Sequence, residues 1–253
     1  MPRPLREAAA PGGPGRARSA LLLLLLALTI TAVTGAARAD ELKPYQATYA
    51  GIWNDMKVAV SHLKLEHTGD TWTTTSSSSP HGIIGHLAAG IFPPRQVSVV
   101  RVTASGVEPQ SFRSEGGKRD KSINLVYDWP GTRVTGLYEG TQVDQALAPG
   151  VQDDGSVQLA LIVELLAGLT PRSFRMIDRN GTREYQFARD GEATLQTAIG
   201  AVRTVVYRAQ KAGSPRITRF WCAPERGYVP LKVEQTRGDE VQWTMEIESL
   251  TRG

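Results

Sequence analysis

The chain's single cysteine, Cys222, lies in the segment FWCAPERGYVP (residues 220–230), beside side chains that could act as acid or base. A nucleophilic cysteine needs a base within hydrogen-bonding distance and a lowered pKa. All four histidines lie in the first half of the chain, so no imidazole is near Cys222 in sequence. A strand, a turn and a returning strand explain the segment without catalysis. We therefore predict that Cys222 is a structural residue at the end of a β-strand.

The four histidines form two pairs, His62 with His67 and His81 with His86, and the members of each pair are five residues apart. On a strand this spacing places the two side chains on opposite faces, and on a helix it places them about 140° apart. The sequence contains no H-E-x-x-H or C-x-x-C motif, which are common in zinc sites. We therefore expect no metal site, no cofactor and no catalytic residue of these types.

The segment QDDGS places two carboxylates, Asp153 and Asp154, beside Ser156. A hydrolase acting on an envelope polymer would need these acids, or Glu164, to meet a histidine or a second acid in a cleft. The alternative is a helix N-terminus, where acidic and hydroxyl side chains accept hydrogen bonds from free backbone N–H groups. This second interpretation accounts for all three residues, so we favour it.

Four tryptophans on or beside predicted strands are the candidate ligand-binding residues: Trp53, Trp72, Trp221 and Trp243. Facing inward, they would line an apolar cavity. The alternative is that they fill the core, which is the commoner role of buried aromatic side chains.

From residue 44 onward the dominant pattern is alternation of apolar and polar residues, clearest in VQWTMEIESL (241–250). Such alternation is typical of strands with one buried face. Turn motifs recur throughout, and we predict hairpin turns at Gly238–Asp239 and at Asp190–Gly191. The sequence thus predicts a mainly β fold, an antiparallel meander of about ten to fourteen strands that forms a closed or half-open barrel-like sheet.

Two segments depart from this alternation. Residues 154–168 are apolar almost all round, which predicts a buried helix that plugs or covers the barrel and ends near Gly168. Residues 81–92 are apolar and rich in glycine, which predicts a short helix or an apolar loop. The preceding TTTSSSSP (73–80) is either low-complexity sequence or the polar end of a strand.

The N-terminal segment resembles a cleaved signal peptide. Basic residues precede an apolar run, and AARAD follows it, so we predict cleavage between Ala39 and Asp40. Residues 1–39 are then the signal peptide and residues 40–253 a single β-rich domain. The rival interpretation, an uncleaved membrane anchor, requires a longer apolar run. We expect a periplasmic protein without a stable membrane span after cleavage.

Cleavage also changes the charge. The precursor has 29 basic and 25 acidic side chains, but residues 40–253 contain equal numbers of each. The precursor's high pI is therefore no argument for a nucleic-acid partner, and we expect none.

Several motifs, in order, resemble the bacterial exported family labelled Domain of Unknown Function 3108. The resemblance covers residues 44–250 and rests on YQATYAGIW, on GVEPQSFRSEGG with INLVYDWPGTRVT, on VQDDGSVQLALIVELL and on FWCAPERGYVPLKVEQ. It implies a mostly antiparallel envelope or periplasmic protein, and it supplies no known reaction. In the family pattern the position of Cys222 is variable. The C-terminal hairpin is also loosely similar to the half-open barrels of periplasmic lipoprotein carriers.

Three functions remain open at this point. The leading hypothesis is a non-enzymatic periplasmic carrier of an apolar small molecule or lipid, such as an acyl chain. The second is an interaction protein whose partner is an envelope protein, which predicts an exposed apolar patch or a long unpaired edge strand. The third is the envelope-polymer hydrolase.

Overall fold

The computed structural model describes residues 42–253, apart from 88–90 and 116–120. The predicted signal peptide and its cleavage site between Ala39 and Asp40 lie outside the described residues. The statements that follow concern the described part of the chain.

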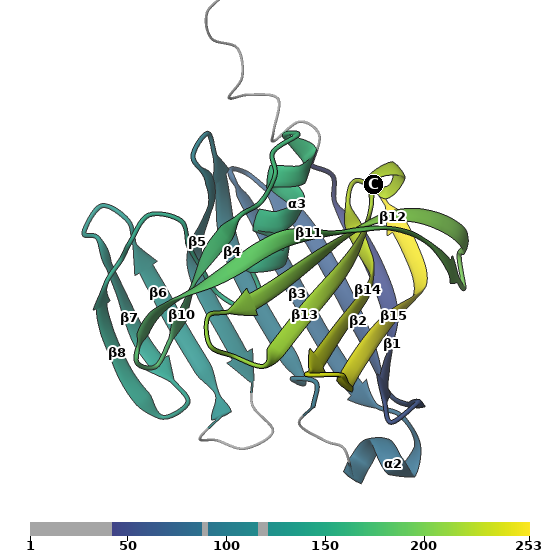
Figure 1. Cartoon of the computed structure of the whole chain (residues 1–253). Coiled ribbons are helices and arrows are strands. Elements are labelled where there is room, and N and C mark those ends of the chain that lie inside the picture. Colours follow the sequence, from purple (N-terminus) through teal and green to yellow (C-terminus); the bar gives the residue numbers. More distant parts are fainter. Residues whose placement is uncertain (1–41, 88–90, 116–120) are drawn as a thin grey trace, which may run out of the picture. The chain divides into compact units, whose positions relative to one another are not determined.

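Strands account for most of this part (Figure 1). The strands are β1 (Tyr45–Trp53), β2 (Met56–Thr68), β3 (Thr71–Pro80), β4 (Arg95–Thr103), β5 (Gly106–Glu115), β6 (Ile123–Asp128), β7 (Arg133–Tyr138), β8 (Thr141–Ala146), β9 (Val151–Gln152), β10 (Ser173–Asp178), β11 (Gly181–Thr197), β12 (Gly200–Lys211), β13 (Arg216–Ala223), β14 (Val229–Arg237) and β15 (Glu240–Arg252). The helices are α2 (Gly82–Leu87), α3 (Val157–Leu166) and the short 3-10 turn η2 (Pro224–Arg226).

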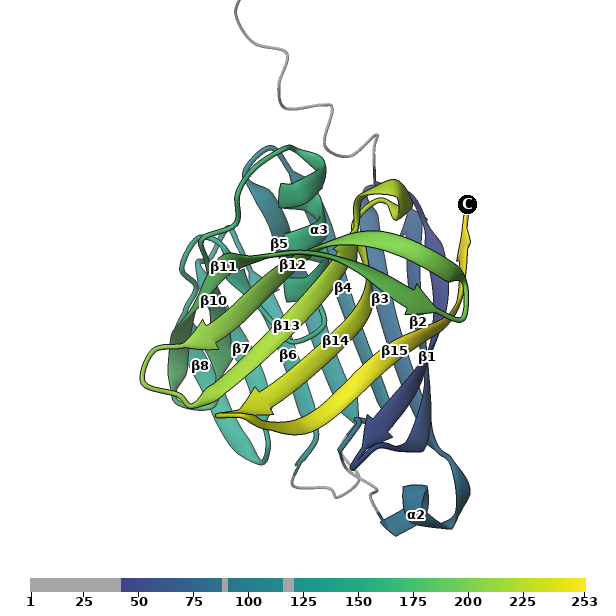
Figure 2. The ribbon, with the colours of Figure 1, turned by 45° about the vertical axis from the view of Figure 1, so that its right-hand side comes forward.

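All the strands form one 15-stranded sheet with the order β8-β7-β6-β5-β4-β3-β2-β1-β15-β14-β13-β12-β11-β10-β9. Neighbours are antiparallel except β9 and β10, which are parallel. The sheet curls round α3 so that β11–β14 face β3–β6 (Figures 1 and 2). Its edges, β8 and β9, are not hydrogen-bonded to each other, so the predicted half-open form is confirmed. The strand count exceeds the expected range by one, because sequence alternation does not reveal a two-residue strand such as β9.

The two edges of the sheet share no backbone ladder, but side chains of β7 and β8 contact β10. Ile177 of β10 packs in the same buried cluster as Val134 and Val143 of β7 and β8. Gln145 of β8 also donates a hydrogen bond from Nε2 to the backbone oxygen of Asp178, at 3.3 Å. The interior is therefore closed on this side by packing rather than by a strand ladder.

The predicted buried helix is confirmed as α3, which lies inside the curled sheet. Its side chains are apolar on nearly every side, because every side meets a strand of the surrounding sheet. Six of its ten residues are buried: Leu159, Ala160, Leu161, Ile162, Val163 and Leu165.

The helix ends as the sequence predicts. Gly168 has a φ of +68°, which is the left-handed conformation that glycine adopts at low cost. The N–H groups of Gly168 and Leu169 donate to the carbonyls of Leu165 and Glu164, at 3.0 and 2.9 Å. This is the Schellman arrangement, which satisfies the last carbonyls of a helix.

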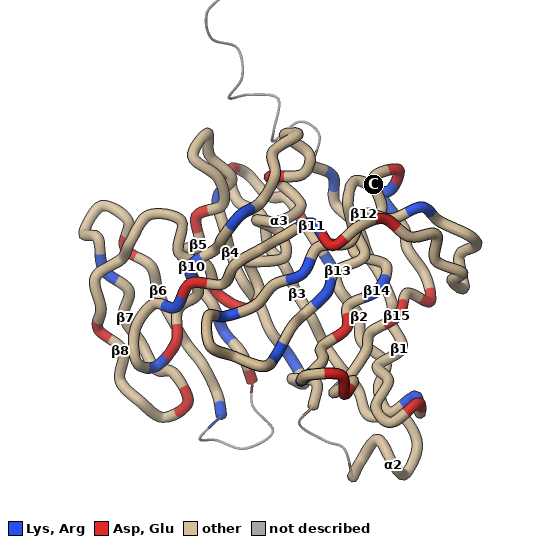
Figure 3. The backbone as a smooth tube through the Cα atoms, viewed as in Figure 1, with Lys and Arg blue, Asp and Glu red and all other residues tan. Residues whose placement is uncertain are grey.

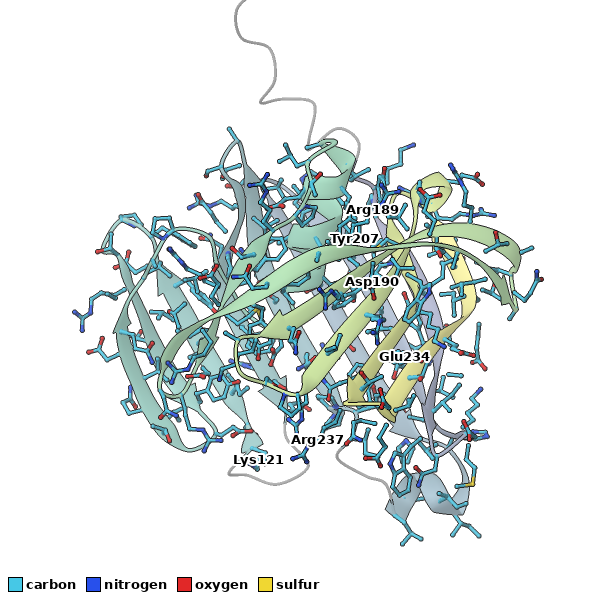
Figure 4. All side chains as sticks on the ribbon, viewed as in Figure 1. Lys121, Arg189, Asp190, Tyr207, Glu234 and Arg237 are labelled. Carbon is cyan, nitrogen blue, oxygen red and sulfur yellow. The ribbon has the colours of Figure 1, made fainter. Side chains whose placement is uncertain are left out.

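The predicted hairpin turn at Gly238–Asp239 is confirmed between β14 and β15, but the one at Asp190–Gly191 is wrong. Residues Gly181–Thr197 form one long strand, β11, whose register against β12 shifts between Arg189 and Gly191. Asp190, labelled in Figure 4, is thus the extra residue of a β-bulge. Its carboxylate pairs with Nε of Arg219 at 2.9 Å. Glycine suits a bulge as well as a turn, and the partner strand decides between them.

The segment between β3 and β4 contains the six-residue helix α2, so the helix alternative predicted for this segment is confirmed among its described residues. Gly85 packs so closely on β2 that a Cβ there would lie 2.3 Å from the backbone oxygen of Val58. Ile83 and Leu87, by contrast, are 84% and 83% exposed. The helix is therefore attached through its glycine and presents large apolar side chains to solvent.

Charges of both signs are interspersed along the strands of the described surface, as Figure 3 shows. Many form short pairs, such as Lys57 with Glu248 at 2.5 Å and Arg179 with Glu139 at 2.6 Å.

Candidate functional site

A cavity of about 400 Å³ lies within the curled sheet, between its inner face and the N-terminal part of α3. Nearly every central strand contributes to its wall. The lining residues are Tyr45, Tyr49, Leu63, Thr74, Thr75, Ser76, Ser78, Ile91, Phe92, Pro93, Gln96, Asp154, Gly155, Val157, Gln158, Leu159, Met176, Tyr185, Phe187, Ala209, Thr218, Phe220, Val233, Gln235, Trp243 and Met245.

One wall of the cavity is aromatic and aliphatic. Phe187 and Phe220 stack with ring centroids 6.2 Å apart, and Phe92 meets Trp243 edge-on at 5.9 Å. The ring of Phe92 lies against Gly51, where an added Cβ would approach it to 2.8 Å. A glycine on β1 therefore lets the loop after α2 reach the interior.

The opposite wall carries hydroxyl groups. The low-complexity segment TTTSSSSP is part of β3, so its interpretation as a strand end is confirmed. Its residues Thr74, Ser76 and Ser78 alternate along the strand and line the cavity. This wall is polar but uncharged, because Ser and Thr offer hydrogen bonds without the cost of burying a charge.

Of the three residues predicted to form the helix N-terminus, Asp153 provides the carboxylate that caps it. The carboxylate of Asp153 accepts hydrogen bonds from the backbone N–H groups of Gly155 and Ser156, at 2.9 and 2.8 Å. The hydroxyl of Ser156 accepts one in return from the N–H of Asp153, at 2.9 Å. Such a reciprocal pair is a capping box.

Asp153 is buried, and its second oxygen accepts a hydrogen bond from the hydroxyl of Ser98 at 3.1 Å. Burial raises the pKa of Asp153 to about 7, although the hydrogen bonds from Ser156 and Ser98 lower it. Asp153 thus connects the N-terminus of α3 to Ser98 of β4 and holds the helix against the sheet. The pKa of its carboxyl group is far above the usual value of an aspartate.

Asp154 has no role in the cap and lines the cavity instead. Asp154 is an exposed residue, so its carboxylate is in contact with water. Nearby protein atoms that displace part of this water raise the pKa of Asp154, and the negative charge of Glu139 raises it further. The helix N-terminus thus does not account for all three residues of the QDDGS segment, since Asp154 is left over.

The four predicted tryptophans lie in different environments in the structure. Trp243 lines the cavity, whereas Trp72 packs in the core and stacks on His67 with ring centroids 4.3 Å apart. Trp221 lies beneath the ammonium group of Lys232. Neither Trp221 nor Trp53 is a lining residue.

Sequence reasoning missed most of the wall, including Tyr45, Tyr49 and Phe92. Tyr49 is anchored by a hydrogen bond from its hydroxyl to the backbone oxygen of Pro230, at 2.8 Å. The alternation of β1 places Tyr45 and Tyr49 on one face, and this was the signal that could have identified them. The loop residue Phe92 had no such signal.

No histidine lines the cavity, and Asp154 is its single carboxylate among the described residues. His62 lies beside the hydroxyl of Thr48 at 3.2 Å, and His81 and His86 lie at α2. Within the described ranges, no three His, Cys, Asp or Glu side chains are grouped as a metal site would require.

Cys222 is a fully buried residue of β13. Burial raises the pKa of its thiol, whereas a nucleophilic cysteine needs a lowered one. It lies next to an irregularity in the pairing of β13 with β14, opposite Pro230. The structural interpretation of the FWCAPERGYVP segment agrees with this environment.

Cys222 therefore offers a simple test of the fold. We expect the native protein to react with Ellman's reagent at least 100-fold more slowly than the unfolded chain, because the buried thiol must be exposed first. The unfolded chain in guanidinium chloride should release one equivalent of thionitrobenzoate. Fast stoichiometric labelling of the native protein would contradict the described burial.

The family model for the proteins of unknown function called DUF3108 matches residues 44–245. The chain belongs to the DUF3108 family. A search of curated proteins finds no match.

Two solved structures extend the comparison. A beta-barrel-like protein of the domain family DUF1849 from Brucella abortus is 11% identical with a TM-score of 0.50, over 84% of this chain and 98% of that one. This DUF3108 protein thus shares the fold of that barrel-like protein. A Bacteroides fragilis protein, described as a candidate exported protein with a YmcC-like fold, is 9% identical with a TM-score of 0.34, over 83% and 94% of the two chains.

None of the helices in the described part of the chain is long and apolar enough to cross a membrane.

Proposed function

We propose that this protein is a non-enzymatic binder or carrier of an apolar ligand, such as a lipid or an acyl chain, in the periplasm. The observation that carries the proposal is the cavity of about 400 Å³, in which an apolar and aromatic wall faces a wall of uncharged hydroxyl groups. Small-molecule sites are concave, mostly apolar and about 300–1,000 Å³ in volume. An interior of this size inside a barrel-like sheet suits one chain-like apolar ligand.

The periplasmic part of the proposal rests on the N-terminal segment. A basic start, an apolar run and a small-residue cleavage motif are typical of exported bacterial proteins. A carrier in an aqueous compartment must shield an apolar ligand from water, and a cavity within a curled sheet removes much of the ligand's surface from water.

Native mass spectrometry tests the proposal. The full chain is expressed in bacteria, purified without detergent from the compartment where it accumulates, and examined before and after extraction with organic solvent. We expect an additional mass of a few hundred daltons that the extraction removes, because apolar cavities of this size retain lipids during purification.

The extracted protein provides the second half of the test. We expect it to take up a dodecyl-chain amphiphile at a 1:1 ratio. A chain that is purified free of ligand, and that also fails to take up any dodecyl-chain compound, would contradict the carrier function.

A second candidate function has one specific observation in its favour. The exposed apolar side chains of α2, Ile83 and Leu87, suit an interaction protein in an envelope assembly. That function predicts contacts through α2 and requires no ligand in the cavity. Cross-linking in cells from α2, with an empty cavity by mass spectrometry, would favour it over the carrier.

A further inference from the structure

Asp154 is the one charged side chain on the cavity wall. The other described lining residues are apolar or aromatic, or they carry hydroxyl or amide groups; none is Lys, Arg, His or Glu. Asp154 is exposed to solvent, so water stabilises its charge in the absence of a ligand. A cationic group bound in the cavity would form an ion pair with it.

No described residue pairs with the carboxylate of Asp154 through a hydrogen bond or a salt bridge. Its neighbour Asp153 accepts hydrogen bonds at both oxygens, from Gly155, Ser156 and Ser98. The capping role that could explain an acid at this position is thus already filled. The Asp154 carboxylate remains with both oxygens available on the cavity surface.

The surroundings of Asp154 favour a positive partner. The nearest charged groups that act on its pKa are acidic, since Asp154 raises the pKa of Asp153 and Glu139 raises that of Asp154. The cations in the area are engaged outside the cavity, where Lys121 and Arg179 both pair with Glu139, at 3.5 and 2.6 Å. A ligand anion would therefore meet only like charge, and a ligand cation would meet an unpaired carboxylate.

Further acceptors lie close to Asp154. Gln158, in the first turn of α3, and Tyr45 of β1 line the cavity together with Asp154. An ammonium group has three N–H donors, which a carboxylate, an amide oxygen and a hydroxyl can accept together.

We infer that the ligand of this cavity is a cationic amphiphile, with an apolar body against the aromatic wall and a protonated amine head paired with Asp154. The inference rests on the proposed function, because it specifies the ligand class of the same cavity. It also means that amphiphiles with a carboxylate head bind poorly.

The test uses three probes of equal chain length: dodecylamine, dodecanol and dodecanoate. Each is titrated below its micellar concentration into the full chain, after solvent extraction, by isothermal titration calorimetry at pH 7. An alkylamine is protonated at this pH, as lysine is. We expect dodecylamine to bind most tightly, dodecanol less tightly and dodecanoate least.

The variant Asp154→Asn keeps the shape of the side chain and removes its charge. We expect dodecylamine to bind about 2-fold to 5-fold more weakly, as for the loss of an ion pair that stays in contact with water, and dodecanoate to bind more tightly than to the native chain. Asp144→Asn is the matched control, because Asp144 is an exposed residue of β8 that pairs with Arg133 outside the cavity. It should leave all three affinities unchanged.

The outcomes separate the two proposals. Binding of all three probes with equal affinity, or unchanged dodecylamine binding in Asp154→Asn, would overturn the cationic head group and leave the carrier function in place. Failure of every probe to bind would overturn both. Weaker binding in Asp144→Asn equal to that in Asp154→Asn would show a general charge effect and would also overturn the assignment to Asp154.

Discussion

The free energy of unfolding is expected to fall by about 4 kcal/mol as the pH rises from 4 to 8, and Asp153→Asn is expected to remove this part of the dependence. Asp153 has a pKa of about 7 in the folded protein, because it is buried. In the unfolded chain its pKa is that of an exposed aspartate. The raised pKa means that the folded state prefers the neutral acid.

The direction of the pH dependence follows from the difference between the pKa values of Asp153 in the folded and unfolded states. Below about pH 4 the acid is neutral in both states and its stabilising contribution is complete. Between the two pKa values the unfolded chain releases a proton that the folded protein retains, so stability declines until the pH passes 7. An asparagine can still accept the hydrogen bonds of Gly155 and Ser156 through its amide oxygen, so the cap of α3 is kept.

Urea unfolding at a series of pH values, followed by circular dichroism, measures this effect. Asp144→Asn is the control, because it removes an exposed carboxylate and should keep the native pH profile. Asp154→Asn should remove a further part of the decline, since the pKa of Asp154 is also raised. A profile for Asp153→Asn parallel to that of the native protein would contradict the described environment of Asp153.

The substitution Ala209→Trp is expected to abolish binding of dodecylamine and to eliminate any copurified ligand. Ala209 lies on β12 between Phe187 and Thr218 on the neighbouring strands, and all three line the cavity. An indole at this position would occupy the space that the ligand's apolar body needs. Overpacking costs about 1–3 kcal/mol of stability, which a sheet of this size should tolerate.

Ala201→Trp is the matched control, because Ala201 is an exposed residue of the same strand. Calorimetry with dodecylamine and native mass spectrometry give the readout, and circular dichroism shows that both variants remain folded. Full binding by a folded Ala209→Trp variant would place the ligand outside this cavity and would contradict the carrier proposal.

Local chemistry in the sequence was enough to predict the strand pattern, the hairpin turn at Gly238–Asp239 and the plug helix. In β15 the alternation of apolar and polar residues places Trp243, Met245 and Ile247 toward the interior. The apolar run of α3 needs an enclosing sheet, and Gly168 ends that helix in a left-handed conformation that glycine adopts at low cost. These features depend on residues that are close together in the chain, so they can be predicted from a single sequence.

The tertiary structure decided between the alternatives that the sequence left open. Asp190–Gly191 is a bulge because β12 continues opposite it as one strand, and Asp154 faces the cavity because Asp153 takes the cap. Three tryptophans of the predicted set do not line the cavity, and a loop residue, Phe92, does. The sequence by itself determined the elements and the barrel-like class. The cavity, and the single carboxylate among its described lining residues, could be found only from the tertiary structure. Strands that are far apart in the chain form the cavity wall, and the curvature and register of the sheet decide which of their side chains meet.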